Sequence, residues 1–323
     1  LNLLVSEMGR DPLETMNVKN ARKYLQIGEY SKALASLHNE ITLNPKNHLA
    51  LNSYSECIYA SIPYIKHESV LPMIKEAISC SLQACSLDSS CSEYFYQSGL
   101  VFTALGMENK WIGNEGKYTF ISAMDAFDKS FKLDTTNISV IYGMAKTLCE
   151  ASFISSKIDF TLEEKKSNLL FAIDLLSKLE RVIPSEDCYN YLITAYVNLR
   201  EIGKAVICCD RAIAFNPNWY RGYFLRGDIK IFDMDMFNDG LLDLERALAL
   251  CNVPTDKADI YALRATAYEQ KAFKDRERMA LYVVNALGDY QKAYELTQNP
   301  EYLRYKDELV NKFNSHKVSK DNL

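Results

Sequence analysis

Cys80, Cys85 and Cys91 form the pattern in this chain that is most similar to a metal site. Structural zinc sites use cysteines separated by two to four residues, and a second pair or histidines complete the four ligands. Here the intervals contain four and five residues, and Cys80 and Cys85 lie in an apolar helical pattern. We therefore interpret these cysteines as core residues and predict no metal site and no cofactor.

The sequence also lacks the motifs of common catalytic sites. Its glycines form neither phosphate-binding pattern, and it contains no Gly-x-Ser-x-Gly nucleophile turn and no His-Glu-x-x-His motif. Carboxylates are plentiful but are typical of the solvated faces of helices. No two of the four histidines stand three or four residues apart; they are His38, His48, His67 and His316. The sequence thus predicts that the protein is not an enzyme.

Composition narrows the class of partner. The 323 residues carry a formal net charge of -5 and no basic stripe, which disfavours nucleic acid. No apolar run approaches the ~18 to 20 residues that span a bilayer, so we expect no membrane insertion. Nine cysteines, mostly inside apolar helical patterns, indicate a reducing compartment. We expect a cytoplasmic location, with the nucleus as the alternative.

A short pattern recurs along the chain and defines the elements. It consists of a small residue, a bulky residue four positions later, then apolar residues and a turn. Successive copies lie 44, 46, 49, 33, 35 and 40 residues apart. Small residues let antiparallel helices approach closely, and a proline such as Pro217 ends the second helix. The copies begin at Ala33, Ala77, Ala123, Ala172, Ala205, Gly240 and Ala280.

These copies resemble the tetratricopeptide repeat (TPR) family over about residues 14 to 297. Gly28-Glu29-Tyr30 is similar to the turn between the two helices of a TPR pair. The most similar copy contains Tyr189, Leu192, Ile193, Tyr196, Ala205, Ala212 and Pro217. The resemblance implies an all-α fold: a right-handed α-solenoid of about seven TPR-like helix pairs, with insertions between the helices of repeats 2–4 and a C-terminal capping helix.

The repeat phase divides the chain into segments. We predict an N-terminal segment at 1-13, a solenoid at 14-299, a capping helix at 300-313 and a tail at 314-323. The expected repeats are 14-47, 48-91, 92-137, 138-185, 186-219, 220-254 and 255-299, and the insertions are 61–72, 107–119 and 150–167. Because equivalent turns align in a stack, we expect the insertions to form one continuous edge.

Local signals add three expectations. Ser90-x-x-Glu93 and Thr161-x-x-Glu164 are typical of capping boxes, in which a hydroxyl and a carboxylate satisfy the first backbone N–H groups of a helix. The segment Leu287-Gly288-Asp289-Tyr290 is similar to a further turn between helices.

The resemblance implies binding of a peptide or helix in a concave groove lined by the first helices. Trp111, in the second insertion, is a candidate for a second contact surface, although the interpretation we favour is that it holds its own loop against the array. Several groove tyrosines are alternatively explained by packing between repeats. The candidate groove residues are Lys19, Arg22, Asn52, Tyr96, Tyr142, Lys146, Asn190, Tyr191, Arg221 and Phe224.

Three functions follow from this resemblance. The first is a protein–protein interaction scaffold or adaptor, and the alternative is a structural subunit of a large multiprotein assembly. The third is a chaperone co-factor whose groove clamps a carboxylate. Arg221 matches one basic position of such a clamp, but Leu225, Tyr191 and Tyr142 replace three of its other residues. The sequence therefore disfavours this third function.

Overall fold

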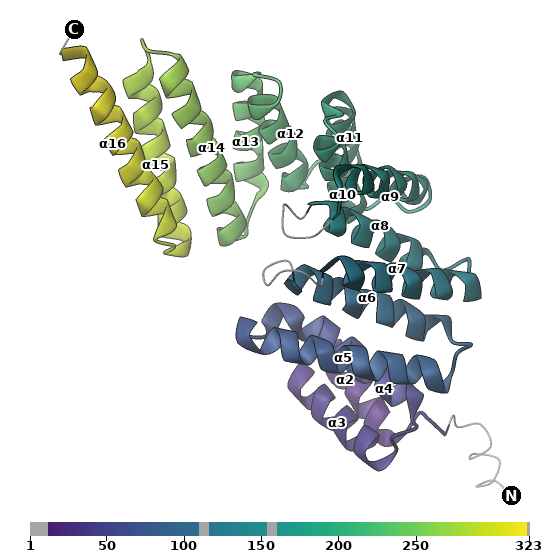
Figure 1. The fold of residues 1–323 in the computed structure, drawn as a ribbon. Helices are drawn as coiled ribbons and strands as arrows, with labels where there is room; N and C mark the ends of the chain where they lie inside the picture. The colour runs from purple at the N-terminus through teal and green to yellow at the C-terminus, as the bar shows by residue number, and fades with distance from the viewer. Residues whose placement is uncertain (1–11, 110–115, 154–159, 322–323) are drawn as a thin grey trace, which may run out of the picture. The chain divides into compact units, whose positions relative to one another are not determined.

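A computed structural model describes residues 12–109, 116–153 and 160–321. Within these ranges the regular elements are helices, and there is no strand (Figure 1). The chain divides into two compact units, unit 1 at Leu1–Val182 and unit 2 at Ile183–Leu323. We describe each unit by itself.

Unit 1 consists of consecutive antiparallel helices that pack as pairs (Figure 1). In each pair a first helix is followed by a second: α2 by α3, α4 by α5, α6 by α7 and α8 by α9. The bounds are α2 Met16–Gln26, α3 Tyr30–Leu43, α4 His48–Ser61, α5 His67–Leu87, α6 Ser92–Asn109, α7 Gly116–Leu133, α8 Ile138–Phe153 and α9 Leu162–Val182. A short 3-10 helix, η1 (Ile62–Tyr64), joins α4 to α5.

Small residues allow this packing, as the repeat pattern predicts. Ala33, Ala123 and Ala172 on the second helices are fully buried, and Leu37 and Phe127, four positions after two of them, fill the space beside. Buried apolar surface contributes roughly 25 cal/mol per Å², and it is distributed here over successive helix pairs.

Most of the described residues in the predicted insertions lie in helices, and residues 110–115 and 154–159 of the second and third insertions lie outside the described ranges. The second helices α5 and α9 each contain 21 residues, whereas α3 contains 14. Of the two capping boxes, the one at Thr161 is confirmed: Thr161 N–H donates to Glu164 Oε2 (2.8 Å), and Glu164 N–H donates to Thr161 Oγ1 (3.2 Å). The box at Ser90 is wrong, because Ser90 Oγ donates to Asp88 Oδ1 (2.7 Å) and α6 begins at Ser92.

Unit 2 repeats the same arrangement with pairs α10–α11, α12–α13 and α14–α15, and α16 packs on α15. The predicted turn at Leu287–Tyr290 is wrong: these residues lie inside α15, where Tyr290 is buried against Tyr305 of α16. The bounds are α10 Glu186–Asn198, α11 Ile202–Phe215, α12 Tyr220–Phe232, α13 Phe237–Leu250, α14 Pro254–Lys274, α15 Met279–Thr297 and α16 Glu301–Asp321.

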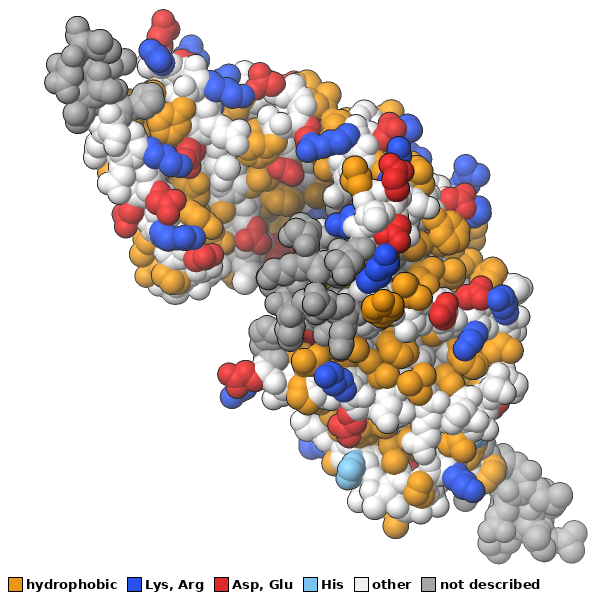
Figure 2. Space-filling view, in the orientation of Figure 1, with side chains coloured by type: hydrophobic (Ala, Val, Ile, Leu, Met, Phe, Trp, Pro, Cys, Tyr) orange, Lys and Arg blue, Asp and Glu red, His pale blue; other side chains and the backbone are white. Residues whose placement is uncertain are grey.

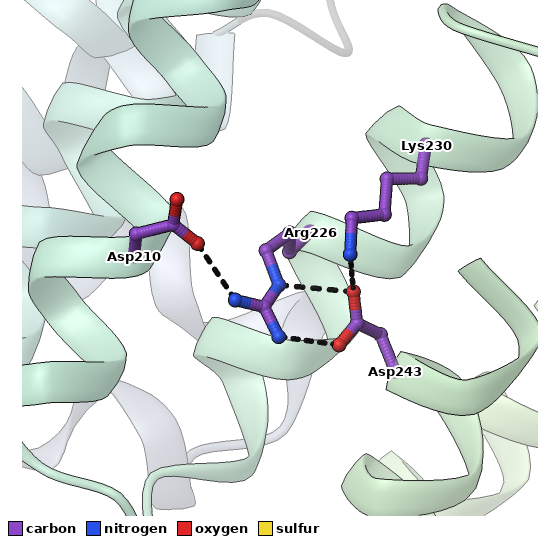
Figure 3. Close-up of polar contacts among 4 residues, drawn as sticks. All are labelled: Asp210, Arg226, Lys230 and Asp243. Atoms are coloured by element: carbon purple, nitrogen blue, oxygen red, sulfur yellow. Dashed lines mark hydrogen bonds and ion pairs between the residues drawn. The ribbon is translucent and has the colours of Figure 1, made fainter. Parts of the chain in front are cut away.

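Two arginine–aspartate pairs, each with a half-buried arginine and a buried aspartate, join first to second helices in unit 2. Arg226 of α12 donates from Nε and Nη2 to both carboxylate oxygens of Asp243 on α13 (2.9 and 2.6 Å) (Figure 3). Asp210 of α11 accepts from Arg226 Nη1 (2.6 Å), and Lys230 donates to Asp243 Oδ2 (2.7 Å). Arg264 and Asp289 repeat the pairing between α14 and α15 at 2.7 and 2.8 Å. These charges hold helix pairs together.

Candidate partner-binding surfaces

The candidate groove residues of unit 1 lie on its first helices, α2, α4, α6 and α8. Residues spaced three or four apart on a helix share one face. On α4 this strip contains Asn52, Glu56 and Tyr59, and on α6 it contains Glu93, Gln97 and Ala104. We call these strips, together with Lys146 of α8, the first-helix face of unit 1.

The two basic candidates on α2 are already paired. Arg22 Nη1 lies 2.7 Å from Glu14 Oε1, and Lys19 Nζ lies 3.7 Å from Glu14 Oε2. Both cations are partly exposed, so these pairs contribute little to stability and remain open to exchange with a ligand. Partial loss of hydration raises the pKa of Glu56 on the next first helix, and the positive charge of Arg22 opposes part of this rise.

Asn52 is more buried than the groove prediction implied, with 6% of its surface exposed. Its Oδ1 accepts no hydrogen bond from the described residues. Gln97 on α6 is similar: it is 3% exposed, and its Nε2 donates to no described residue. Buried polar atoms without partners are uncommon in native proteins, and bound water or a ligand group commonly satisfies them.

Glu56 and Glu93 are exposed carboxylates on neighbouring first helices, and neither forms an ion pair with a described residue. The pKa of Glu93 is raised, first by loss of hydration around its carboxyl and second by the negative charge of Glu56. The two groups are therefore close enough to repel each other. The negative charges of Glu56 and Glu93 therefore favour binding of a cation at this part of the first-helix face.

Tyr96 is half-buried, and its ring packs against Phe127 with the centroids 5.9 Å apart. Burial, the nearby Tyr59 and Glu93 together raise the pKa of Tyr96 to about 12. Tyr96 therefore both fills the space between repeats and contributes an edge to the first-helix face. Tyr142 is half-buried on α8, one turn before Lys146.

A cavity of about 370 Å³ continues the first-helix face. The half-buried Lys146 lines it from α8, and its ammonium makes no ion pair or hydrogen bond with a described residue. Glu108 adds a second charge to the wall. The other lining residues are mainly apolar and come from α4, η1, α5 and α6: Tyr59, Ala60, Ile62, Pro63, Ile74, Thr103, Ala104 and Met107.

In unit 2 the structure brings Arg221 and Phe224 together. They line a small cleft of about 100 Å³ between α12 and α14, with Asp256 and Asp259 on its other wall. Tyr220 donates its hydroxyl hydrogen to Asp256; burial, followed by this bond, raises the Tyr220 pKa to about 12. The cleft thus combines one arginine with two carboxylates.

Asn190 and Tyr191 lie on α10, and neither lines this cleft. The backbone carbonyl of Asn190 accepts from Thr194 Oγ1 (2.8 Å), while its side-chain Oδ1 is buried and accepts no hydrogen bond from the described residues. Trp111, the candidate for a second surface, lies outside the described residues.

The sequence reasoning did not include Tyr59, Glu93 and Met107 among the candidates. Each stands three, four or seven residues from another residue of its strip, so extending the helical spacing along α4 and α6 would have found them.

Other classes of site find no support in the described ranges: they contain no cluster of three or more potential metal ligands and no helix long and apolar enough to cross a bilayer.

Solved structures share this arrangement of helix pairs. A tetratricopeptide repeat protein from Parabacteroides merdae aligns with 93% of this chain and 99% of its own length, at a TM-score of 0.59 and 15% identity. The C-terminal part of a TPR repeat-containing protein from Cytophaga hutchinsonii aligns with 88% of this chain and 98% of its own length, at 0.54 and 15%. The chain has a TPR fold.

No family model and no curated protein matches the sequence. The TPR fold of this chain is therefore shown by structure, through the order and antiparallel pairing of its helices. At 15% identity the likeness concerns the fold alone.

Proposed function

We propose that this TPR chain is a non-enzymatic protein–protein interaction scaffold that binds a peptide or helix of its partner. The observation that carries the proposal is the first-helix face of unit 1. Its cavity of about 370 Å³ is mainly apolar, and the half-buried lysine in its wall pairs with no described residue. Recognition sites combine apolar surface with a few polar groups that fix orientation.

The candidate groove residues support this proposal to different degrees. Lys146, Tyr96 and Asn52 belong to one face with a cavity, which favours a direct role. Arg221 and Phe224 line the smaller cleft of unit 2, where Asp256 and Asp259 disfavour an incoming carboxylate. The chaperone co-factor function therefore has little support in this cleft.

Peptide display on the whole chain tests the proposed function. The expected result is that a random library yields peptides that bind the parent and lose at least ~10-fold in affinity on a Tyr59→Ala/Lys146→Ala variant. Tyr118→Ala/Lys178→Ala, on the exposed second helices α7 and α9, is the matched control and should bind as the parent does. Retention of all selected peptides by the Tyr59/Lys146 variant would refute the proposal.

A structural subunit of a larger assembly is the second candidate, and one observation favours it. Tyr118 and Ile121 on α7 and Leu170 and Phe171 on α9 are exposed apolar residues on second helices. On the face drawn in Figure 2, hydrophobic side chains lie exposed between charged ones. Apolar surface of this kind is typical of contacts between subunits. Light scattering of the Ile121→Ser/Phe171→Ser variant against the parent tests it: the parent should self-associate and the variant should not.

A further inference from the structure

The strips on α4 and α6 place two kinds of binding determinant next to each other. At one end lie the carboxylates of Glu56 and Glu93, which are exposed and form no ion pair with a described residue. At the other end lies the mainly apolar cavity, which Tyr59 of α4 and Ala104 of α6 both line. A ligand that lies along the face meets both.

We propose that the first-helix face of unit 1 recognises a basic–apolar peptide segment, in which a lysine or arginine lies against Glu56 and Glu93 and a large apolar side chain fills the cavity. This inference rests on the proposed function and specifies its ligand. The carboxylates supply charge complementarity, because neither forms an ion pair with a described residue and Arg22 offsets the charge of Glu56 only in part.

The positions on the helices set the spacing of the two side chains. Glu56 precedes Tyr59 by three residues, which is ~5 Å along the helix, and Glu93 precedes Thr103 by ten residues, which is ~15 Å. An extended peptide advances ~3.3 Å per residue. The basic and apolar side chains of the ligand therefore stand about two to five residues apart.

Two buried side-chain amides, each with one atom that forms no hydrogen bond to a described residue, lie on the same strips. Asn52 is four residues before Glu56, and Gln97 is four residues after Glu93, so each amide shares a face with a carboxylate. Asn52 Oδ1 lacks a donor and Gln97 Nε2 lacks an acceptor among the described residues. The N–H and C=O groups of an extended backbone offer one of each.

The charges of the first-helix face determine which end of it binds a cationic side chain. The side chain of Lys146, which pairs with no residue that the structure describes, lines the cavity from α8, whereas Glu56 and Glu93 lie on α4 and α6. The cavity wall carries one charge of each sign, Lys146 and Glu108, whereas Glu56 and Glu93 outside the cavity are both negative, so a cationic side chain is attracted more strongly outside the cavity than inside it. The mainly apolar lining of the cavity therefore favours the apolar side chain.

The experiment is to pan a random 12-residue peptide library on the full chain and to sequence the bound pool. We expect enrichment of peptides with Lys or Arg about two to five residues from a large apolar residue. On Glu56→Gln/Glu93→Gln, the basic enrichment should disappear, and the affinity of a selected peptide should fall at least ~10-fold. The control Asp125→Asn/Glu163→Gln removes the same charge from exposed positions of α7 and α9 and should leave both unchanged.

A second variant tests the cavity. Ala104→Phe, or Ala60→Phe should that variant not fold by circular dichroism, fills the cavity and should remove the apolar preference while keeping the basic one. A selected pool without basic residues, or one dominated by Asp and Glu, overturns this inference while the proposed function stands. A parent that selects no peptide overturns both.

Discussion

The guanidinium of Arg226 donates two hydrogen bonds to the carboxylate of Asp243, and this contact joins α12 to α13 (Figure 3). Only 6% of Asp243 is exposed, and Lys230 donates to the same carboxylate. Without Asp243, Arg226 keeps only Asp210 and Lys230 loses its carboxylate, so half-buried positive charge is left with too little compensation. The stability of unit 2 therefore depends strongly on this contact.

We expect Asp243→Ala to lower the free energy of unfolding by about 3–5 kcal/mol. Chemical denaturation followed by circular dichroism measures the change. Asp128→Ala is the control: its pair with Lys132, one turn away on α7, is exposed and should contribute at most about 0.5 kcal/mol. An equal effect of the two substitutions would contradict the structural role of the buried pair.

Gly240 marks a close approach between α12 and α13. A Cβ atom added there would lie 2.8 Å from the backbone oxygen of Gly227 and would collide with Ile231. We expect Gly240→Ala to destabilise the protein by about 1–3 kcal/mol, measured as a lower unfolding midpoint. Gly288, inside α15, has open space around the same position, so Gly288→Ala should stabilise by about 0.5–1 kcal/mol.

The buried carboxylate of Glu40 makes stability depend on pH. Burial by itself would raise the pKa of Glu40, but hydrogen bonds from Asn44, Asn47 and Asn17 lower it below the usual value. A lowered folded-state pKa adds stability above the unfolded-state pKa, and this stability is lost as the pH falls through the folded-state pKa.

We therefore expect Glu40→Gln to lower the melting temperature at pH 7 and to differ less from the parent as the pH falls below about 4. Differential scanning calorimetry across this range gives the comparison. Glu163→Gln, at an exposed position of α9, should follow the parent throughout. If the difference in melting temperature between Glu40→Gln and the parent stays constant with pH, protonation of Glu40 does not cause the pH dependence of stability.

Cysteine reactivity should follow burial. All nine cysteines are free thiols; burial raises the pKa of Cys57 to about 12 and of Cys80 to about 11. Thiolates react and thiols do not. With iodoacetamide, mass spectrometry should find the half-buried Cys91 modified before Cys57, Cys149 and Cys209 in the native protein. In denaturant, all four should react at similar rates.

The sequence predicted the fold well because repetition multiplies weak signals. Ala33, Ala123, Ala172 and Ala205 are individually common residues, but a recurring small residue at this spacing requires close helix contact, and all four are fully buried. The turn at Gly28, with a φ of 75°, is likewise visible in sequence, because glycine adopts this backbone conformation readily.

The candidate site was harder to predict. Helical spacing placed Asn52, Tyr96 and Lys146 on the first helices, but it could not show that Asn52 is buried or that Lys146 lines a cavity. The cavity depends on neighbours such as Ile62 and Ile74, which line it from η1 and α5. The turn predicted at Gly288 was wrong for a related reason: local residues favoured a break, whereas packing on α14 and α16 keeps α15 continuous.

The network around Glu40 has a consequence for the ageing of the protein. Asn47 holds this carboxylate from one side (3.0 Å) and the backbone oxygen of Leu13 from the other (2.9 Å). Hydrolytic deamidation of Asn47 would replace the donating amide with a second carboxylate directly beside the first. Two negative charges would then face each other in a buried place. Deamidation of this single residue would therefore destabilise the first helix pair, α2–α3.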